Sequence, residues 1–144
     1  DEHFSVGING KNSEFHAAMG LCNFDHLEKI INCRKTISNQ YDQLLYPSLQ
    51  RPAALPGTEY NYAYYPVILP GEEVLKNVVT KLNGAGIYPR RYFYPSLNTL
   101  PYLTKQPACP VSEKYSLRVL SLPLYVGLQG SDVERISEII NSCI

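Results

Sequence analysis

The amino-acid sequence predicts an α+β fold, with two N-terminal helices followed by a small three-stranded sheet that has helices on one face. Three observations indicate this fold. Apolar residues recur at helical spacing in residues 1–46, prolines cluster in residues 47–59, and strand-like and helix-like patterns alternate in residues 60–144. We therefore expect a helical segment, a proline-rich crossing loop and a small α+β C-terminal domain, in that order. The length of 144 residues is sufficient for one hydrophobic core.

Two helices are expected in the first segment. Asn12 is placed to cap a helix over residues 13–22, whose apolar stripe consists of Phe15, Ala18, Met19 and Cys22. Asp25 is expected to start a second helix through a capping box with Glu28, and Pro47 is expected to end it. The second stripe consists of Leu27, Ile30, Ile31, Ile37, Tyr41, Leu44 and Leu45. So long a stripe requires a large partner surface.

Strands and helices alternate in the last segment. Strands are expected where aromatic and β-branched residues cluster, at residues 60–69, 87–91 and 119–122. Helices are expected at residues 72–82, at 110–117 with Pro110 in the first turn, and after Ser131, which pairs with Glu134 in a capping box. A long loop with four prolines is expected over residues 92–110.

The composition argues against several classes of protein. Thirteen basic and thirteen acidic residues balance, which disfavours a general nucleic-acid coat or a polybasic membrane anchor. The four cysteines form no Cys-x-x-Cys pair, so we expect reduced, mostly buried thiols. A zinc site of Cys22, His26 and Cys33 is disfavoured because residues 23–25 resemble a helix break. Twelve tyrosines and no tryptophan suggest a wet interface or a site lined with hydroxyls.

Two motifs carry candidate binding chemistry. Residues 7–12 combine glycines, Asn9 and Lys11 just before a predicted helix, which are the ingredients of a phosphate site, although a solvated turn also accounts for them. Residues 89–98 combine groups that can bind phosphate, a base or a sugar: Arg90, Arg91, Tyr92, Tyr94, Ser96 and Asn98. An ordinary exposed loop accounts for the second motif equally well.

Together with their neighbours, these motifs resemble the pyridoxal-phosphate-dependent sugar aminotransferases of the DegT/DnrJ/EryC1/StrS family. Four segments carry the resemblance: Gly7-x-Asn9-x-Lys11-x-Ser13-Glu14-x-x-Ala17-Ala18-x-Gly20-Leu21 with Arg34 and Tyr41 further on, Gly86-Ile87-x-x-Arg90-Arg91-Tyr92-Phe93-Tyr94-Pro95, Cys109-Pro110-Val111-Ser112-Glu113, and Arg118-Val119-Leu120-Ser121-Leu122-Pro123-Leu124-Tyr125. They occur in the family's order over nearly the whole chain.

The resemblance implies that the chain is the C-terminal part of a longer enzyme, as does its start without Met. Family members carry the cofactor-binding sheet and the Schiff-base lysine in a large N-terminal domain. That lysine lies in a Ser-x-x-x-x-Lys segment shortly before a Glu-Gly-Gly string, which this chain lacks. We therefore expect residues 1–46 to link to the large domain. We also expect no catalytic residue in the chain and no activity from it alone.

The resemblance also implies roles for the two motifs. Asn9 and Lys11 would contact the phosphate of pyridoxal 5'-phosphate bound to the partner subunit of a homodimer with shared active sites. The second motif would contact the nucleotide sugar. Many members have Leu-His where this chain has Ser96-Leu97-Asn98, and the string resembles the branch that aminates dTDP-linked keto-6-deoxy hexoses. Glutamate would be the amino donor, the product would serve lipopolysaccharide O-antigen or capsule synthesis, and the enzyme would be cytoplasmic.

Two alternatives from other classes stay open. A catalytically inactive dimerisation or interaction module of the same fold would self-associate without binding the cofactor. A single-stranded nucleic-acid binder would use residues 90–92, and its affinity would fall steeply with salt. The neutral net charge argues against the second alternative.

Overall fold

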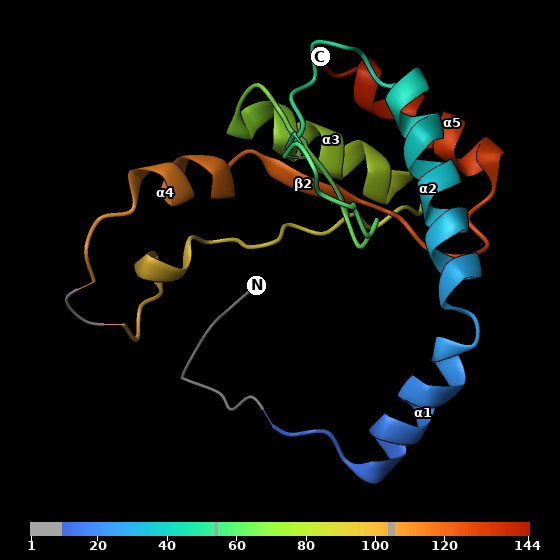
Figure 1. Ribbon diagram of the computed structural model, residues 1–144. Helices are drawn as coiled ribbons and strands as arrows, with labels where there is room; N and C mark the ends of the chain where they lie inside the picture. Colours follow the sequence, from blue (N-terminus) through green and yellow to red (C-terminus); the bar gives the residue numbers. More distant parts are fainter. Residues whose placement is uncertain (1–9, 54, 104–105) are drawn as a thin grey trace.

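The computed structural model describes residues 10–53, 55–103 and 106–144 (Figure 1). Five α-helices, one 3-10 turn and two strands follow one another in this part of the chain: α1 (Glu14–Phe24), α2 (Leu27–Leu44), β1 (Tyr65–Ile68), α3 (Glu72–Gly84), η1 (Leu97–Thr99), α4 (Pro110–Ser116), β2 (Val119–Leu122) and α5 (Gly130–Asn141). The predicted α+β class is confirmed. None of these helices is both long and apolar enough to span a bilayer.

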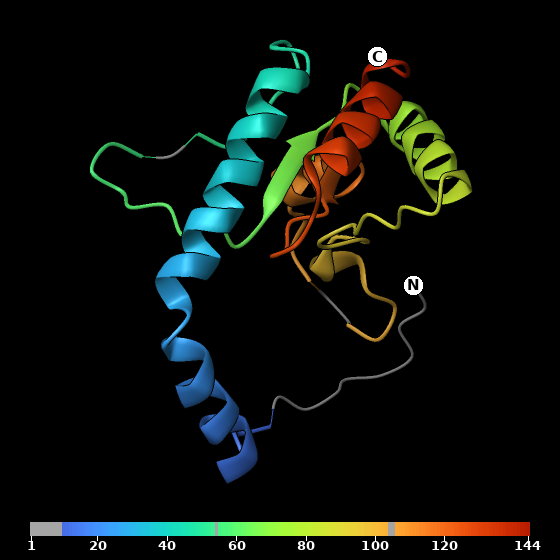
Figure 2. The same cartoon turned by 90° about the vertical axis from the view of Figure 1, so that its right-hand side faces the viewer.

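The two N-terminal helices are present, but their predicted caps are wrong. The hydroxyl oxygen of Ser13, not the side chain of Asn12, caps α1 by accepting a hydrogen bond from the His16 N–H at 3.4 Å. Asp25 follows α1 as its C-terminal cap, and α2 begins after His26 without a side-chain cap. Only Asp25 and His26 separate the two helices. Helix α1 extends from the N-terminal end of α2, away from the sheet (Figure 2).

The sheet has two strands in the described residues rather than the three predicted. Strand β1 pairs antiparallel with β2, with Val67 opposite Leu120. The predicted third strand is reduced to one bridge, in which the Arg90 N–H donates to the Ser121 carbonyl at 3.1 Å and the Ser121 N–H donates to the Arg90 carbonyl at 2.8 Å. The next hydrogen-bonded pair in this register would place Tyr88 opposite Pro123, which has no N–H to donate.

Helices α2, α3 and α5 cover one face of the sheet, as predicted, and α2 lies beside α5 (Figure 1). Every second side chain of each strand points into the core that lies between the sheet and these helices. The buried core comprises Ile37, Tyr41, Leu45, Leu49, Tyr65, Val67, Leu69, Leu75, Val78, Leu82, Leu120, Leu122, Val133, Ile136 and Ile140. The C-terminal half of α2 therefore shares one core with the residues that follow the proline-rich loop.

Tyr41 connects α2 to the end of β2. Its side chain is fully buried, its ring stacks on Tyr65 with centroids 4.8 Å apart, and its hydroxyl donates to the Pro123 carbonyl at 3.1 Å. Burial, with the nearby Tyr65 as a smaller cause, raises the pKa of Tyr41 above its ordinary value. The hydroxyl therefore stays protonated as a donor.

Replacing Tyr41 with phenylalanine should lower the free energy of unfolding of the chain by about 1 kcal/mol, because the Pro123 carbonyl loses its partner while the ring packing is kept. Urea unfolding followed by circular dichroism measures the change. Tyr125→Phe is the matched control, because the side chain of Tyr125 is half exposed. Equal stability of the two variants would show that the Tyr41 hydrogen bond contributes nothing net.

Two further predictions from the sequence need correction. Helix α5 begins at Gly130 after Gln129, with no side-chain cap, so the capping box of Ser131 and Glu134 is wrong. The four cysteines are free, but Cys22 is exposed and the other three are only partly buried, so the expectation of mostly buried thiols is also wrong. Cys22 is exposed because nothing in the described structure covers α1.

Candidate functional site

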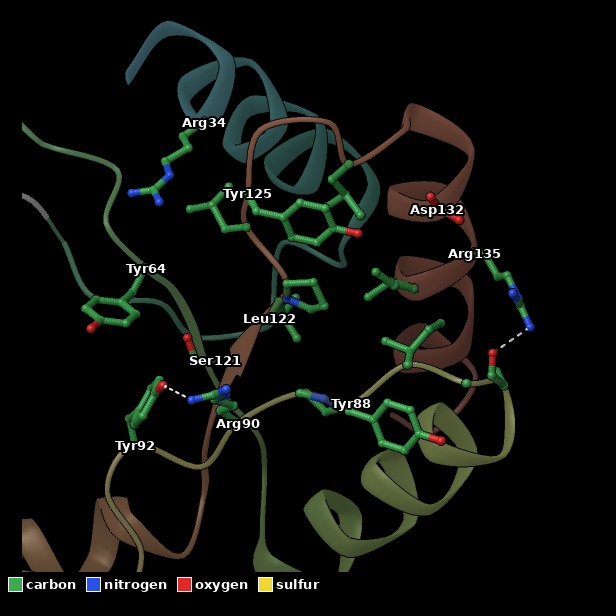
Figure 3. Close-up of a pocket in the computed structure, with 18 of the residues that line it drawn as sticks. Arg34, Tyr64, Tyr88, Arg90, Tyr92, Ser121, Leu122, Tyr125, Asp132 and Arg135 are labelled. Atoms are coloured by element: carbon green, nitrogen blue, oxygen red, sulfur yellow. Dashed lines mark hydrogen bonds between the residues drawn. The ribbon is translucent and has the colours of Figure 1, made fainter. Parts of the chain in front are cut away.

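A cavity of about 750 Å³ lies beside the bridge between Arg90 and Ser121 (Figure 3). Its wall comes from α2, the segment before β1, the segment after α3, strand β2 with the segment that follows it, and α5, through residues that include Arg34, Tyr64, Tyr88, Arg90, Tyr92, Ser121, Tyr125, Asp132 and Arg135. The backbone bridge holds Arg90 at the edge of the sheet, so this side chain is presented to the cavity from an anchored position. Two of the predicted site residues, Arg90 and Tyr92, line this cavity.

Arg90 and Tyr92 form a pair. The Arg90 Nη1 donates to the Tyr92 hydroxyl at 2.9 Å, and the guanidinium carbon lies 5.9 Å from the centroid of the Tyr92 ring. The Tyr92 ring in turn meets Tyr64 edge-on, with centroids 5.5 Å apart. These contacts orient a guanidinium group and two aromatic rings on one side of the cavity, where Figure 3 also shows Arg34.

Arg91 and Tyr94 form a second pair, which lines a neighbouring hollow of about 490 Å³. The guanidinium carbon of Arg91 lies 3.4 Å from the Tyr94 ring centroid, and its Nη2 donates to the Ser116 carbonyl at 3.3 Å. The Nε of Arg91 is buried and has no hydrogen-bond partner in the described residues. Arg90 and Tyr92 also line this hollow, so it adjoins the main cavity.

Ser96 and Asn98 lie elsewhere, against α4, and neither lines the main cavity. Ser96 is 4% exposed; its hydroxyl donates to the Asn98 Oδ1 at 2.6 Å and lies 2.7 Å from the Ser112 hydroxyl. The Asn98 Nδ2 donates to the Glu113 Oε1 at 2.7 Å. The hydrogen bonds of both side chains therefore join the loop to α4.

The first predicted motif is only partly described. Asn9 lies outside the described residues. Lys11 is exposed, two positions before the Ser13 cap of α1. Lys11 thus precedes a helix N-terminus, where the helix dipole and free N–H groups favour an anion.

Several cavity residues did not stand out as site residues in the sequence: Arg34, Tyr64, Tyr88, Tyr125, Asp132 and Arg135. For Arg34 a signal exists, because it occupies a helical step between Ile30 and Ile37 and so places a charge on the apolar stripe of α2. Its Nε is buried without a hydrogen-bond partner in the described residues. The others lie on loops or on α5 and are brought together only by the fold.

The side chains of the cavity suit an anionic ligand that carries a ring. The lining contains three guanidinium groups and only one carboxylate, which belongs to Asp132, and its four tyrosines offer hydroxyl groups and ring faces. The described lining contains no lysine, histidine or cysteine. Within the described ranges, no three His, Cys, Asp or Glu side chains gather as a metal site would require.

Known proteins resemble this chain over most of its length. The family model described as the DegT/DnrJ/EryC1/StrS aminotransferase family matches residues 1–141. The chain is 32% identical to a dTDP-4-amino-4,6-dideoxy-D-glucose transaminase of Escherichia coli over 93% of the chain and 38% of that protein. It is 31% identical to a GDP-perosamine synthase of Vibrio cholerae over 97% of the chain and 40% of that protein. The chain thus spans well under half the length of these relatives.

Solved structures share the fold. The chain superposes on DesI, determined in the presence of its TDP-sugar product, with a TM-score of 0.79 and 28% identity over 95% of the chain and 37% of DesI. It superposes on Helicobacter pylori PseC, an aminotransferase involved in the biosynthesis of pseudoaminic acid, with a TM-score of 0.77 over 99% of the chain and 40% of PseC. At 20% identity, the second likeness shows the fold alone.

Proposed function

The chain belongs to the DegT/DnrJ/EryC1/StrS aminotransferase family, and from this premise we propose that the full-length protein is a sugar transaminase. It converts a nucleotide-linked keto-6-deoxy sugar, with dTDP as the proposed nucleotide, into the amino sugar, and glutamate supplies the amino group. We place the enzyme in the cytoplasm, where its product serves lipopolysaccharide O-antigen or capsule synthesis. Residues 1–46 link to a large domain, residues 47–59 form a crossing loop, and residues 60–144 form the small domain.

The observation that carries this proposal is the anchored pair of Arg90 and Tyr92 at the cavity. A cavity of about 750 Å³ lies in the size range of small-molecule sites. A nucleotide sugar offers a diphosphate to a guanidinium group and flat rings to tyrosines, and Arg90, Tyr92 and Tyr64 provide both kinds of contact. Arg91 and Tyr94 extend the same chemistry into the adjoining hollow.

The chain also has a group that fits the proposed cofactor, pyridoxal 5'-phosphate. Lys11 is an exposed cation beside the N-terminus of α1, which suits a phosphate group. We propose that Lys11, together with Asn9, holds the phosphate of the cofactor bound to a partner subunit. When bound, the cofactor acts as an electron sink for the amino group in transfer. The lysine that carries the cofactor is proposed to lie outside this chain, so the chain alone is inactive.

Helix α1 supports the proposal of a homodimer. It contains no buried residue, and four large apolar side chains on it are 64–86% exposed: Phe15, Met19, Leu21 and Phe24. Phe15 and Phe24 are nine positions apart, which places them on opposite faces of a helix with 3.6 residues per turn. A helix that is apolar all round belongs inside a protein assembly. Glu14 is the only Asp, Glu, Lys or Arg residue of α1, so little charge repels a second copy, and we propose that a second copy covers α1.

The full-length protein, assayed with glutamate and a panel of nucleotide-linked keto sugars, should show pyridoxal absorbance and release one amino sugar together with 2-oxoglutarate. Mass spectrometry identifies the product. The competing function is the inactive dimerisation module, which the exposed α1 also favours. A dimer that lacks pyridoxal absorbance and aminates no sugar in the panel would replace the transaminase proposal with that module.

A further inference from the structure

We infer that Glu113 is a positioning residue that holds the segment from Arg90 to Asn98 in its binding conformation. The inference rests on the proposed function of the cavity that this segment lines. Glu113 itself is on α4 and does not line the cavity, so it acts through other side chains.

Glu113 is the charged end of a chain of hydrogen bonds. Its Oε1 accepts from the Asn98 Nδ2 at 2.7 Å and from the Cys109 N–H at 2.8 Å. Hydrogen bonds to an ionised acceptor are short and stronger than neutral ones. The bond from Asn98, and next the bond from Cys109, hold the pKa of Glu113 below its ordinary value, so the carboxylate is ionised at neutral pH.

The donors along this chain all run in one direction. Ser96 donates its only hydroxyl proton to the Asn98 Oδ1 at 2.6 Å, so Ser112, whose hydroxyl lies 2.7 Å from that of Ser96, must be the donor in the contact between them. Ser112 thus donates a hydrogen bond to Ser96, Ser96 donates one to Asn98, and Asn98 donates one to Glu113. Such aligned bonds polarise one another and end on the carboxylate. Removing Glu113 therefore weakens every hydrogen bond in this series.

Helix α4 holds the segment at two points. The carboxylate of Glu113 fixes Asn98 near the N-terminus of the helix, and the Ser116 carbonyl accepts from Arg91 near its C-terminus. Tyr92 lies between these two anchors, and its hydroxyl accepts the hydrogen bond from Arg90. The position of the Arg90 and Tyr92 pair at the cavity therefore depends on the hydrogen bonds that Asn98 and Arg91 make to α4. Ser96 and Asn98 contribute to binding by fixing the loop rather than by touching the ligand.

The test compares Glu113→Ala, Glu113→Gln and the wild type in the full-length enzyme. Glu113→Ala should raise the KM for the nucleotide sugar about tenfold, because the loop loses a charge-assisted bond, and should leave the KM for glutamate unchanged. Glu113→Gln keeps an oxygen acceptor and should recover most of the loss. Glu134→Ala is the matched control, because Glu134 is exposed on α5 and does not line the cavity.

Hydrogen exchange of the same variants separates this inference from the proposed function. The Thr99 N–H donates to the Ser96 carbonyl at 2.9 Å, so its exchange should become faster in Glu113→Ala and stay unchanged in Glu134→Ala. A wild-type protein without transaminase activity would overturn the proposed function. Exchange at Thr99 would still test whether Glu113 holds the loop against α4. Unchanged exchange in Glu113→Ala, or equal rises in the KM values for sugar and glutamate, would overturn the positioning role.

Discussion

Replacing Arg90 with alanine should raise the KM for the nucleotide sugar in the full-length enzyme by ten- to one-hundredfold, roughly the worth of one charge-assisted hydrogen bond to a phosphate. The glutamate half-reaction should be unchanged, because Arg90 is proposed to contact only the sugar nucleotide. The bridge to Ser121 uses backbone atoms of Arg90 and survives the substitution. The effect is therefore expected from the lost guanidinium group and not from a displaced loop.

Steady-state kinetics are measured in each substrate. The loss of pyridoxal absorbance in a single turnover with glutamate then follows the glutamate half-reaction by itself. Arg90→Lys keeps the charge but loses the planar fork, so it should recover only part of the affinity. Lys114→Ala removes an exposed cation from α4 outside the cavity and is the matched control. Equal damage to both half-reactions in Arg90→Ala would show that Arg90 does not discriminate between the two substrates.

Replacing Phe15 with aspartate should dissociate the proposed homodimer of the full-length protein at micromolar concentration and abolish its transaminase activity. The Phe15 side chain is 86% exposed on α1, and a second copy that covers it would have to bury an unpaired carboxylate in the variant. Phe15 is the second residue of α1, where an acidic side chain favours the helix dipole, so the helix itself should persist. Loss of the dimer would also remove Lys11 from its proposed contact with the partner's cofactor.

Light scattering coupled to size-exclusion chromatography measures the oligomeric state. Val111→Asp is the matched control, because Val111 is 68% exposed on α4 and should tolerate the charge without dissociation. A Phe15→Asp protein that stays dimeric and active would show that the second copy docks elsewhere.

Elements with a strong local signal were predictable from the sequence. Strand β2 and the start of α3 occur at the predicted residues, because Pro123 ends the strand and acidic residues begin the helix after Gly71. Proline begins α4 as predicted, since its missing N–H is not needed in the first turn. The helix caps were wrong at Asn12, Asp25 and Ser131, because local sequence signals place a helix end only to within one or two residues: Ser13 caps α1, and α2 and α5 begin without a side-chain cap.

The candidate site was predictable only in its chemistry. Six polar residues in the stretch from Arg90 to Asn98 share one sequence motif, but the structure turns Arg90 and Tyr92 to the cavity and Ser96 and Asn98 to α4. Residue type alone does not distinguish a serine that binds a ligand from one that binds Ser112. The distinction depends on which helix packs beneath the loop.

The sequence by itself determined the family, the α+β class and the presence of guanidinium, hydroxyl and aromatic groups, because motifs and periodicity are properties of neighbouring residues. Only the tertiary structure decided that the third strand shrinks to the bridge between Arg90 and Ser121, and that Arg34 and Arg135 share one cavity with Arg90. Likewise, only the tertiary structure revealed Glu113 as the anchor of the binding loop. These outcomes depend on contacts between residues far apart in the chain, and packing, rather than local preference, sets the energy of such contacts.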